Sequence, residues 1–157
     1  MECFRVIEAG EGIEGAILRK LSARGGLTEG CVTLNHPALL VVSPRAADRG
    51  LELPGACRTV LLPGKAGGLL EGLRAASAVS YGTSPRDSLT ISSREGDKLW
   101  AALQRELVTV GGRVVERQEF PYRLEKGEGE LSALAVAGAL LLLGVPPEEL
   151  GRRLPEE

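Results

Sequence analysis

A glycine-rich segment near the N-terminus has the spacing of a phosphate-binding loop. It reads Gly10-Glu-Gly-Ile-Glu-Gly15, follows a strand-like run, Cys3–Ala9, and precedes a helical pattern, Ile13–Ala23. This is the order that a dinucleotide-binding fingerprint requires, because its glycines let a phosphate approach the backbone at the start of a helix. Gly10, Gly12 and Gly15 are therefore candidate ligand-binding residues.

Two features of this segment favour a plain strand-to-helix turn instead. Glu11 and Glu14 place negative charge where a phosphate would lie. Dinucleotide-binding folds also carry an acidic residue about 20 positions further on, at the end of a second strand. The residue at that distance is Glu29, which lies in a glycine-rich loop, Gly25–Gly30. Both interpretations stay open.

A second candidate site is the loop that follows the strand-like run Ala78–Tyr81. Gly82 lets a ligand approach the backbone closely, and Ser84-Pro85-Arg86-Asp87 is a turn whose serine and aspartate can bind backbone amides. A neighbouring loop, Gly64–Gly68, supplies a second cationic side chain for an anion. The candidate ligand-binding residues here are Lys65, Tyr81, Gly82, Ser84 and Arg86. The alternative is that they only reverse the chain.

Signals for catalysis and for metal binding are incomplete. Ser80, Ser84, Ser92 and Ser93 are nucleophiles by type, but the chain has one histidine, His36, and three aspartates to activate them. His36 is best explained as a turn or surface residue. The three cysteines, Cys3, Cys31 and Cys57, form no C-x-x-C pair, which indicates buried reduced thiols. We expect no metal site and no cofactor.

The elements that must position these loops follow an α/β order up to Tyr81. Leu39–Ser43 is a continuous apolar run, typical of a strand buried on both faces of a parallel sheet. We expect a polar loop after Pro44, a strand at Arg58–Leu62 and a short helix at Leu69–Ala76. Together these predict a parallel, three-layer, Rossmann-like core.

Closely spaced strands are expected after residue 87. The run Lys98–Val110 fits either a helix or strands. We predict strands, because a hairpin turning at Gly111-Gly112 would satisfy the edges of Leu89–Ser92 and Arg113–Leu124 together. Leu131–Leu143 is apolar nearly all round, which predicts a buried helix with Gly144 just beyond its end. Apolar residues on both faces of 98–124 suggest a homodimer that uses part of this region.

Composition places the chain among globular proteins, as one α/β domain spanning residues 1–157. The charged fraction is 25% and the net charge is −2, with no long basic run, which argues against nucleic-acid binding. The N-terminus lacks the pattern of a signal peptide. Leu131–Val145 is shorter than a membrane span. We therefore expect a cytoplasmic protein without a membrane partner.

Two segments in the C-terminal half of the chain are distinctive. They are the strand end Val79-Ser-Tyr-Gly82 and the segment Leu131-Ser-Ala-Leu-Ala-Val-Ala-Gly-Ala-Leu-Leu-Leu-Leu-Gly-Val-Pro-Pro-Glu-Glu-Leu150. They resemble the end of the ATP-binding central domain of Mur ligases, where an alanine-rich helix runs into Leu-Gly-Val and an acidic short helix. The family's Gly-Lys-Thr/Ser loop is absent, since Gly10–Gly15 stands in its place. The family's adenine-contacting Asn is replaced by Glu130 or its neighbours. The resemblance implies a shortened domain that has lost ligase chemistry.

Two functions from different classes remain. The first is a non-catalytic binder of a small anionic or nucleotide-like ligand, held where the strands of the parallel sheet end. The loops at those ends are Gly10–Gly15, Ser43–Arg45, Gly64–Gly68 and Tyr81–Arg86. The second is a structural or interaction protein that forms homo-oligomers. A degenerate Mur-ligase-like enzyme is a lesser alternative.

Overall fold

The computed structural model describes residues 4–23, 37–49 and 55–152. This part of the chain forms a seven-stranded sheet in the order β1-β2-β3-β4-β5-β6-β9, and a separate hairpin of β7 and β8. The strands are β1 Phe4–Ile7, β2 Leu39–Val42, β3 Ala56–Pro63, β4 Arg74–Tyr81, β5 Leu89–Glu95, β6 Lys98–Leu103, β7 Leu107–Val108, β8 Val114–Val115 and β9 Gln118–Arg123. The helices are α1 Ile13–Ser22, α2 Pro44–Arg49 and α3 Glu130–Leu142, with 3-10 turns η1 Gly64–Leu70 and η2 Pro147–Glu149.

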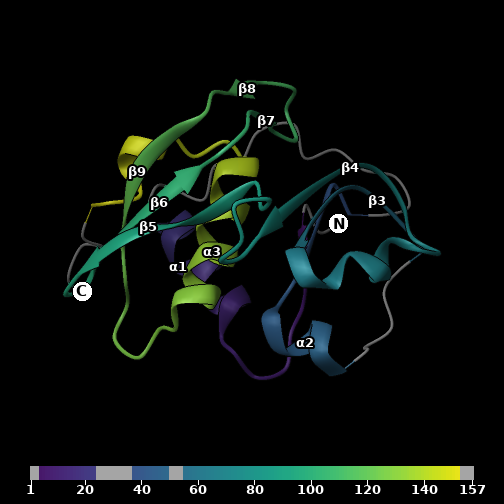
Figure 1. Ribbon diagram of the computed structural model, residues 1–157, viewed down its shortest axis with the longest axis horizontal. Helices are drawn as coiled ribbons and strands as arrows, with labels where there is room; N and C mark the ends of the chain where they lie inside the picture. Colours follow the sequence, from purple (N-terminus) through teal and green to yellow (C-terminus); the bar gives the residue numbers. More distant parts are fainter. Residues whose placement is uncertain (1–3, 24–36, 50–54, 153–157) are drawn as a thin grey trace.

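The sheet is mostly parallel and is flanked by helices, as the alternation of strands and helices predicts (Figure 1). Strands β1 to β4 pair in parallel, whereas β5, β6 and β9 pair antiparallel. The prediction of antiparallel strands after residue 87 is therefore confirmed, including strand rather than helix at Lys98–Leu103. Among the described residues, no helix is long and apolar enough to cross a membrane.

The burial of β2 on both faces explains why its sequence is apolar without alternation. All four residues of β2 are buried. Leu39 and Val41 belong to the larger core cluster with α1 and α3, while Leu40 and Val42 pack in a second cluster with Ala46 of α2. A strand covered on both faces needs apolar side chains at every position.

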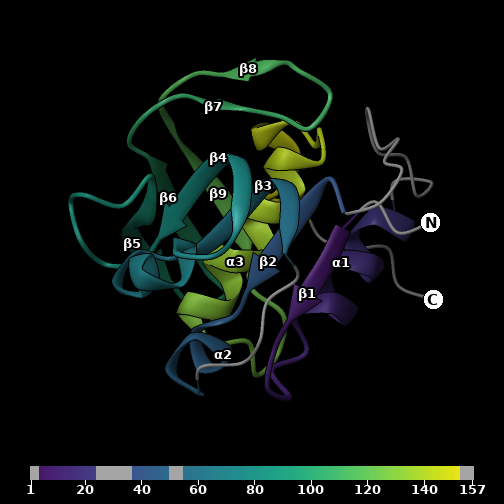
Figure 2. The ribbon, with the colours of Figure 1, turned by 90° about the vertical axis from the view of Figure 1, so that its right-hand side faces the viewer.

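Helix α3 is the centre of the larger core. Ten of its residues, from Ala133 to Leu142, are buried, because α3 packs against α1 and across β2 to β5 (Figure 2). A Cβ on Gly138 would lie 3.0 Å from Leu61 Cδ2, so the glycine lets the helix approach the sheet closely. Gly144 follows the helix with φ of 102°, a left-handed conformation that glycine adopts at low cost. The predicted buried helix is confirmed.

Three local predictions are wrong. The expected helix Leu69–Ala76 is instead η1, and β4 already begins at Arg74, because Gly72 turns the chain with φ of 84°. The expected polar loop after Pro44 is the short helix α2. The expected single strand Arg113–Leu124 is divided into β8 and β9, since β8 pairs with β7 and β9 pairs with β6.

Residues 98–124 do not present two apolar faces to solvent. Leu99, Leu103 and Leu107 are buried, and so is Val110. Val108 and Val114, which are direct cross-strand partners in the β7–β8 hairpin, are 47% and 56% exposed. The large apolar side chains that are exposed here are Val108 and Val114 of the hairpin, and Trp100 is partly exposed.

The sheet divides between β4 and β5. Only Tyr81 of β4 pairs with β5, through Leu89, and beyond that point the two strands lead away from each other (Figure 1). As a result Ala76, Ser77 and Ala78 are exposed, although β4 is the fourth of seven strands.

Candidate functional site

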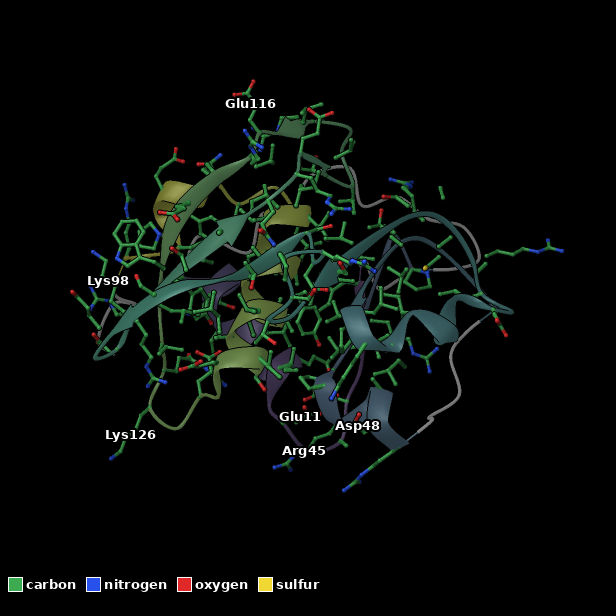
Figure 3. The ribbon with its side chains drawn as sticks, viewed as in Figure 1. Glu11, Arg45, Asp48, Lys98, Glu116 and Lys126 are labelled. Atoms are coloured by element: carbon green, nitrogen blue, oxygen red, sulfur yellow. The ribbon has the colours of Figure 1, made fainter. Side chains whose placement is uncertain are left out.

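The loops at the C-terminal ends of β1 and β2 meet at one edge of the sheet. Figure 3 shows Glu11, Arg45 and Asp48 gathered at this edge, at the bottom of the view. Ligands of open α/β sheets bind at such an edge, so the donors and charges of each loop determine whether it can hold a ligand.

The amides at the start of α1 are already bound by a carboxylate of the same chain. Ile13 N donates to Glu8 Oε1 at 2.8 Å, and Glu14 N donates to Glu8 Oε2 at 3.0 Å. A phosphate at the N-terminus of a helix would use these same donors. Glu8 therefore takes the position that an anionic ligand would need in the Gly10–Gly15 loop.

A second carboxylate joins the first two loops. Glu11 Oε1 accepts hydrogen bonds from Ala9 N at 3.1 Å and from the Ser43 hydroxyl, and Glu11 Oε2 accepts one from Arg45 N at 3.1 Å. The Ser43 hydroxyl in turn accepts a hydrogen bond from Ala46 N and so caps α2. The donors after β2 are thus also occupied from within the chain.

The glycines of the first loop have a conformational role. Gly10 and Gly12 have φ values of 74° and 73°, which residues with a Cβ rarely adopt. Gly15 lies inside α1, where a Cβ would meet the Arg19 side chain at 3.1 Å. The conformation of the turn is therefore enough to explain the spacing of these glycines, without a bound ligand.

The loop after β4 is built on a buried aspartate. Asp87 is 5% exposed and its Oδ2 accepts a hydrogen bond from Ser84 N at 3.0 Å. A Cβ on Gly64 would lie 1.8 Å from Asp87 Oδ1, and a Cβ on Gly82 would lie 2.5 Å from Asp87 Oδ2. The two glycines are therefore required because the carboxylate packs against both loops and joins them.

A pocket of about 150 Å³ lies between these two loops and the start of α3. Its lining residues are Pro63, Gly64, Lys65, Tyr81, Gly82, Thr83 and Leu131. Lys65 Nζ lies 3.3 Å from Asp48 Oδ1, and both side chains are more than half exposed. Thr83 is exposed, and its amide and hydroxyl have no partner among the described residues. Helix α3 begins at Glu130, and its N-cap residue, Gly129, provides no side-chain cap.

The structure brings together three of the eight predicted ligand-binding residues around this pocket: Lys65, Tyr81 and Gly82. Ser84 and Arg86 are in the adjoining turn, where Arg86 N donates to Ser84 Oγ and the Arg86 carbonyl accepts from Arg105. Tyr81 is buried and donates from its hydroxyl to the Val42 carbonyl at 2.6 Å. Burial, aided by Glu11, raises the pKa of Tyr81, which keeps it neutral.

Catalytic chemistry has little support among the described residues. Ser80 Oγ accepts from Ser88 N, and Ser92 donates to Glu119, so neither serine is bonded to a base other than a carboxylate on the surface. His36, Cys3 and Cys31 lie outside the described residues. Cys57 is buried, which raises its pKa to about 11 and keeps it a thiol. No group of three or more Cys, Asp or Glu residues in the described ranges could hold a metal ion.

A buried ionic cluster, which no sequence pattern indicates, lies between α1, β9 and the loop before α3. Lys20 is 6% exposed, and its Nζ lies 4.6 Å from the centre of the Tyr122 ring and 3.3 Å from the Arg123 carbonyl. Tyr122 donates to Glu128 Oε2 at 2.9 Å. Burial raises the pKa of both Tyr122 and Glu128. Lys20 and Tyr122 are about a hundred positions apart, and no local pattern connects them.

An ion pair between Arg19 and Glu125 lies on the surface beside this cluster. Arg19 donates to both carboxylate oxygens of Glu125, at 3.1 Å and 2.8 Å, and this pairing lowers the pKa of Glu125. Arg19, Glu125 and Glu128 also line a pocket of about 130 Å³ with Glu11 and Ser132. Lys126 lines it as well, so three carboxylates and two cationic side chains border this pocket, which makes it less suited to an anion.

We expect the stability of the protein to depend on the charge of Lys20. Burial lowers the pKa of Lys20, against the raising effect of Glu128 and Glu125. Between this lowered pKa and the ordinary value near 10.4, the unfolded chain binds more protons than the folded chain, so stability rises with pH over that interval. Relative to Lys20→Met, the parent protein should therefore become more stable as pH rises through this interval toward about 10.4. Urea unfolding at a series of pH values measures this difference.

Lys126→Met is the matched control, because Lys126 is exposed. Its difference from the parent protein should stay constant over the same pH series. A difference between parent and Lys20→Met that does not change with pH would contradict a buried, titrating Lys20.

Comparison with protein-family models and with curated proteins found no match to this chain.

Proposed function

We propose that the protein binds a small anionic ligand, without catalysis, in the pocket formed by Gly64-Lys65, Tyr81–Thr83 and the start of α3. The observation that carries the proposal is the contrast between the loops at this edge of the sheet. Glu8 and Glu11 occupy the donors after β1 and β2. The pocket after β3 and β4 has a cationic side chain, Lys65, whose ion pair with Asp48 is exposed and can exchange for a ligand, and it has the donors of the exposed Thr83.

The size of the pocket limits the ligand class. About 150 Å³ is less than the roughly 300 Å³ at which pockets begin to enclose drug-sized ligands. A phosphate or carboxylate group matches this volume, with the rest of a nucleotide-like ligand outside it. Lys65 would supply the charge, and Thr83 would supply hydrogen-bond donors to the anionic oxygens.

Three finer expectations belong to this proposal. Helices on both faces of the sheet support a Rossmann-like, three-layer core, in which ligands bind beyond the ends of the strands. The buried thiol of Cys57 suits a cytoplasmic protein. If the chain is a shortened relative of the Mur-ligase central domain, Glu8 stands where that family binds phosphate, which fits a loss of ligase chemistry.

Thermal unfolding in the presence of anions tests the proposal. At a ligand concentration ten times the dissociation constant, the native state gains about 1.4 kcal/mol, which corresponds to a rise in Tm of about 4 °C for a chain of this size. Phosphate, sulfate, nucleotides and sugar nucleotides are compared with sodium chloride at equal ionic strength. We expect Lys65→Gln to abolish the rise.

Arg86→Gln is the matched control, because Arg86 does not line the pocket. It should keep the anion-dependent rise in Tm. Lys65→Gln also removes the ion pair with Asp48. In the absence of ligand this should change the stability of the protein very little, since both side chains are exposed. If no anion raises the Tm above the chloride control, or if Lys65→Gln keeps the rise, the proposed site is wrong.

A second candidate function, assembly through protein contacts, rests on the open edge of β4. It makes no use of the anion pocket and can be tested separately.

A further inference from the structure

The outer edge of β4 has few of the features that protect a sheet edge. From Arg74 to Ser80 it pairs with β3 on one side, and within the described residues it pairs with no strand on the other. Arg74 is the only charged residue of the strand. Natural sheets protect their edges with prolines, charges, bulges or very short strands. An unprotected edge of this length is a site where another strand can add.

The chemistry of the edge specifies the kind of partner. Its backbone amides and carbonyls are complementary to those of an extended strand, so a strand rather than a helix must add to it. The side chains along it are small, since residues 75–78 read Ala-Ala-Ser-Ala, and a facing strand can approach without steric conflict. The edge therefore accommodates an extended segment, including one with small side chains of its own.

We infer that the partner is β4 of a second copy, paired antiparallel about a two-fold axis at Ser77. In this register Ala76 faces Ala78 of the other copy and Ala75 faces Val79. Each pair is compatible in size, and no like charges face each other. The same surface is used on both copies, which is the requirement for a closed two-fold dimer.

β5 does not pair with β4 along this edge. β5 and β6 lead away from β4 after the single pair between Tyr81 and Leu89, as Figure 1 shows. Pairing of two β4 strands would place the two parallel half-sheets side by side in one continuous sheet. The anion pocket lies at the far end of β4, next to Tyr81, and stays accessible in the dimer.

A charge exchange at Ser77 tests both the interface and its register. Ser77 is exposed, so Ser77→Lys and Ser77→Glu should both fold. Each variant alone places two like charges opposite each other at the axis, and the dissociation constant of its dimer should rise on the order of fivefold or more. An equimolar mixture of the two should form a heterodimer at least as tight as the parent dimer. Sedimentation velocity over a concentration series gives these constants.

Ser93→Lys is the matched control, because it makes the same change at an exposed position of β5. It should leave the parent dimer intact. A parent protein that stays monomeric at high micromolar concentration overturns the inference. A parent dimer that Ser77→Lys does not weaken, or variants whose mixture does not recover the affinity, overturns the β4 interface.

Discussion

Leu134→Ala is expected to lower the free energy of unfolding by about 3 kcal/mol, which corresponds to a fall in Tm of about 9 °C. Leu134 is fully buried in α3, in the cluster that α3 forms with α1 and the sheet. The substitution removes apolar contacts and leaves a cavity, because a helix packed on several sides cannot move to fill it. Urea unfolding followed by circular dichroism measures the change.

Leu18→Ala is the control, because it makes the same substitution at an exposed position of another helix. Leu18 lies on α1 and is 49% exposed, so its loss should change the free energy of unfolding by less than about 0.5 kcal/mol. Equal effects of the two substitutions would mean that α3 is not packed as the structure has it.

Gly64→Ala is expected to destabilise the protein by about 2–3 kcal/mol, although it adds only one methyl group. The new Cβ would lie 1.8 Å from Asp87 Oδ1, and the carboxylate is too buried to move aside without losing its hydrogen bond to Ser84 N. The free energy of unfolding from chemical denaturation is again the measurement.

Two further variants isolate the contact with Asp87. Gly67→Ala, in the same 3-10 turn, should be tolerated, because no heavy atom lies within 4 Å of the position of its Cβ. In an Asp87→Ala background, Gly64→Ala should cost much less than in the parent, since residues in contact are not additive. If the cost of Gly64→Ala is the same in both backgrounds, the strain has another source.

The elements with a strong local pattern are the ones that sequence reasoning predicts well. Leu39–Val42 is apolar at every position because both of its faces are covered, and Leu131–Leu143 is apolar all round because α3 is buried. Lys98–Leu103 is composed of good helix formers, yet it is a strand between β5 and β9. There the neighbouring strands override the intrinsic preference of the residues.

The errors lie where a local signal was weak or was given too little weight. Leu69, Leu70 and Leu73 have helical spacing, but Gly72 adopts a positive φ and ends any helix before β4. Ser43 followed by Pro44 is a signal for the start of a helix, since serine caps α2 and proline suits its first turn. That signal could have predicted α2 from the sequence.

The candidate site was only partly predictable for a different reason. The pairing of Gly64–Gly68 with the turn after Tyr81 follows from parallel strands, whose ends meet at the same edge. The roles of Glu8 and Asp87 depend on how their side chains fold back onto the backbone amides of nearby loops. An acidic residue ahead of a glycine-rich turn does not reveal whether it repels an anion or replaces one.

The position of α3 also has a consequence for the order in which the chain is made. α3 packs on α1 and on β2 to β5, all of which are synthesised before it. Until residues 130–142 have left the ribosome, the apolar face of the sheet that they cover has no partner. The contacts that complete the core join residues far apart in the chain, which slows folding. Nascent chains that end before Glu130 are therefore the stage at which this protein is most exposed to aggregation and most in need of chaperones.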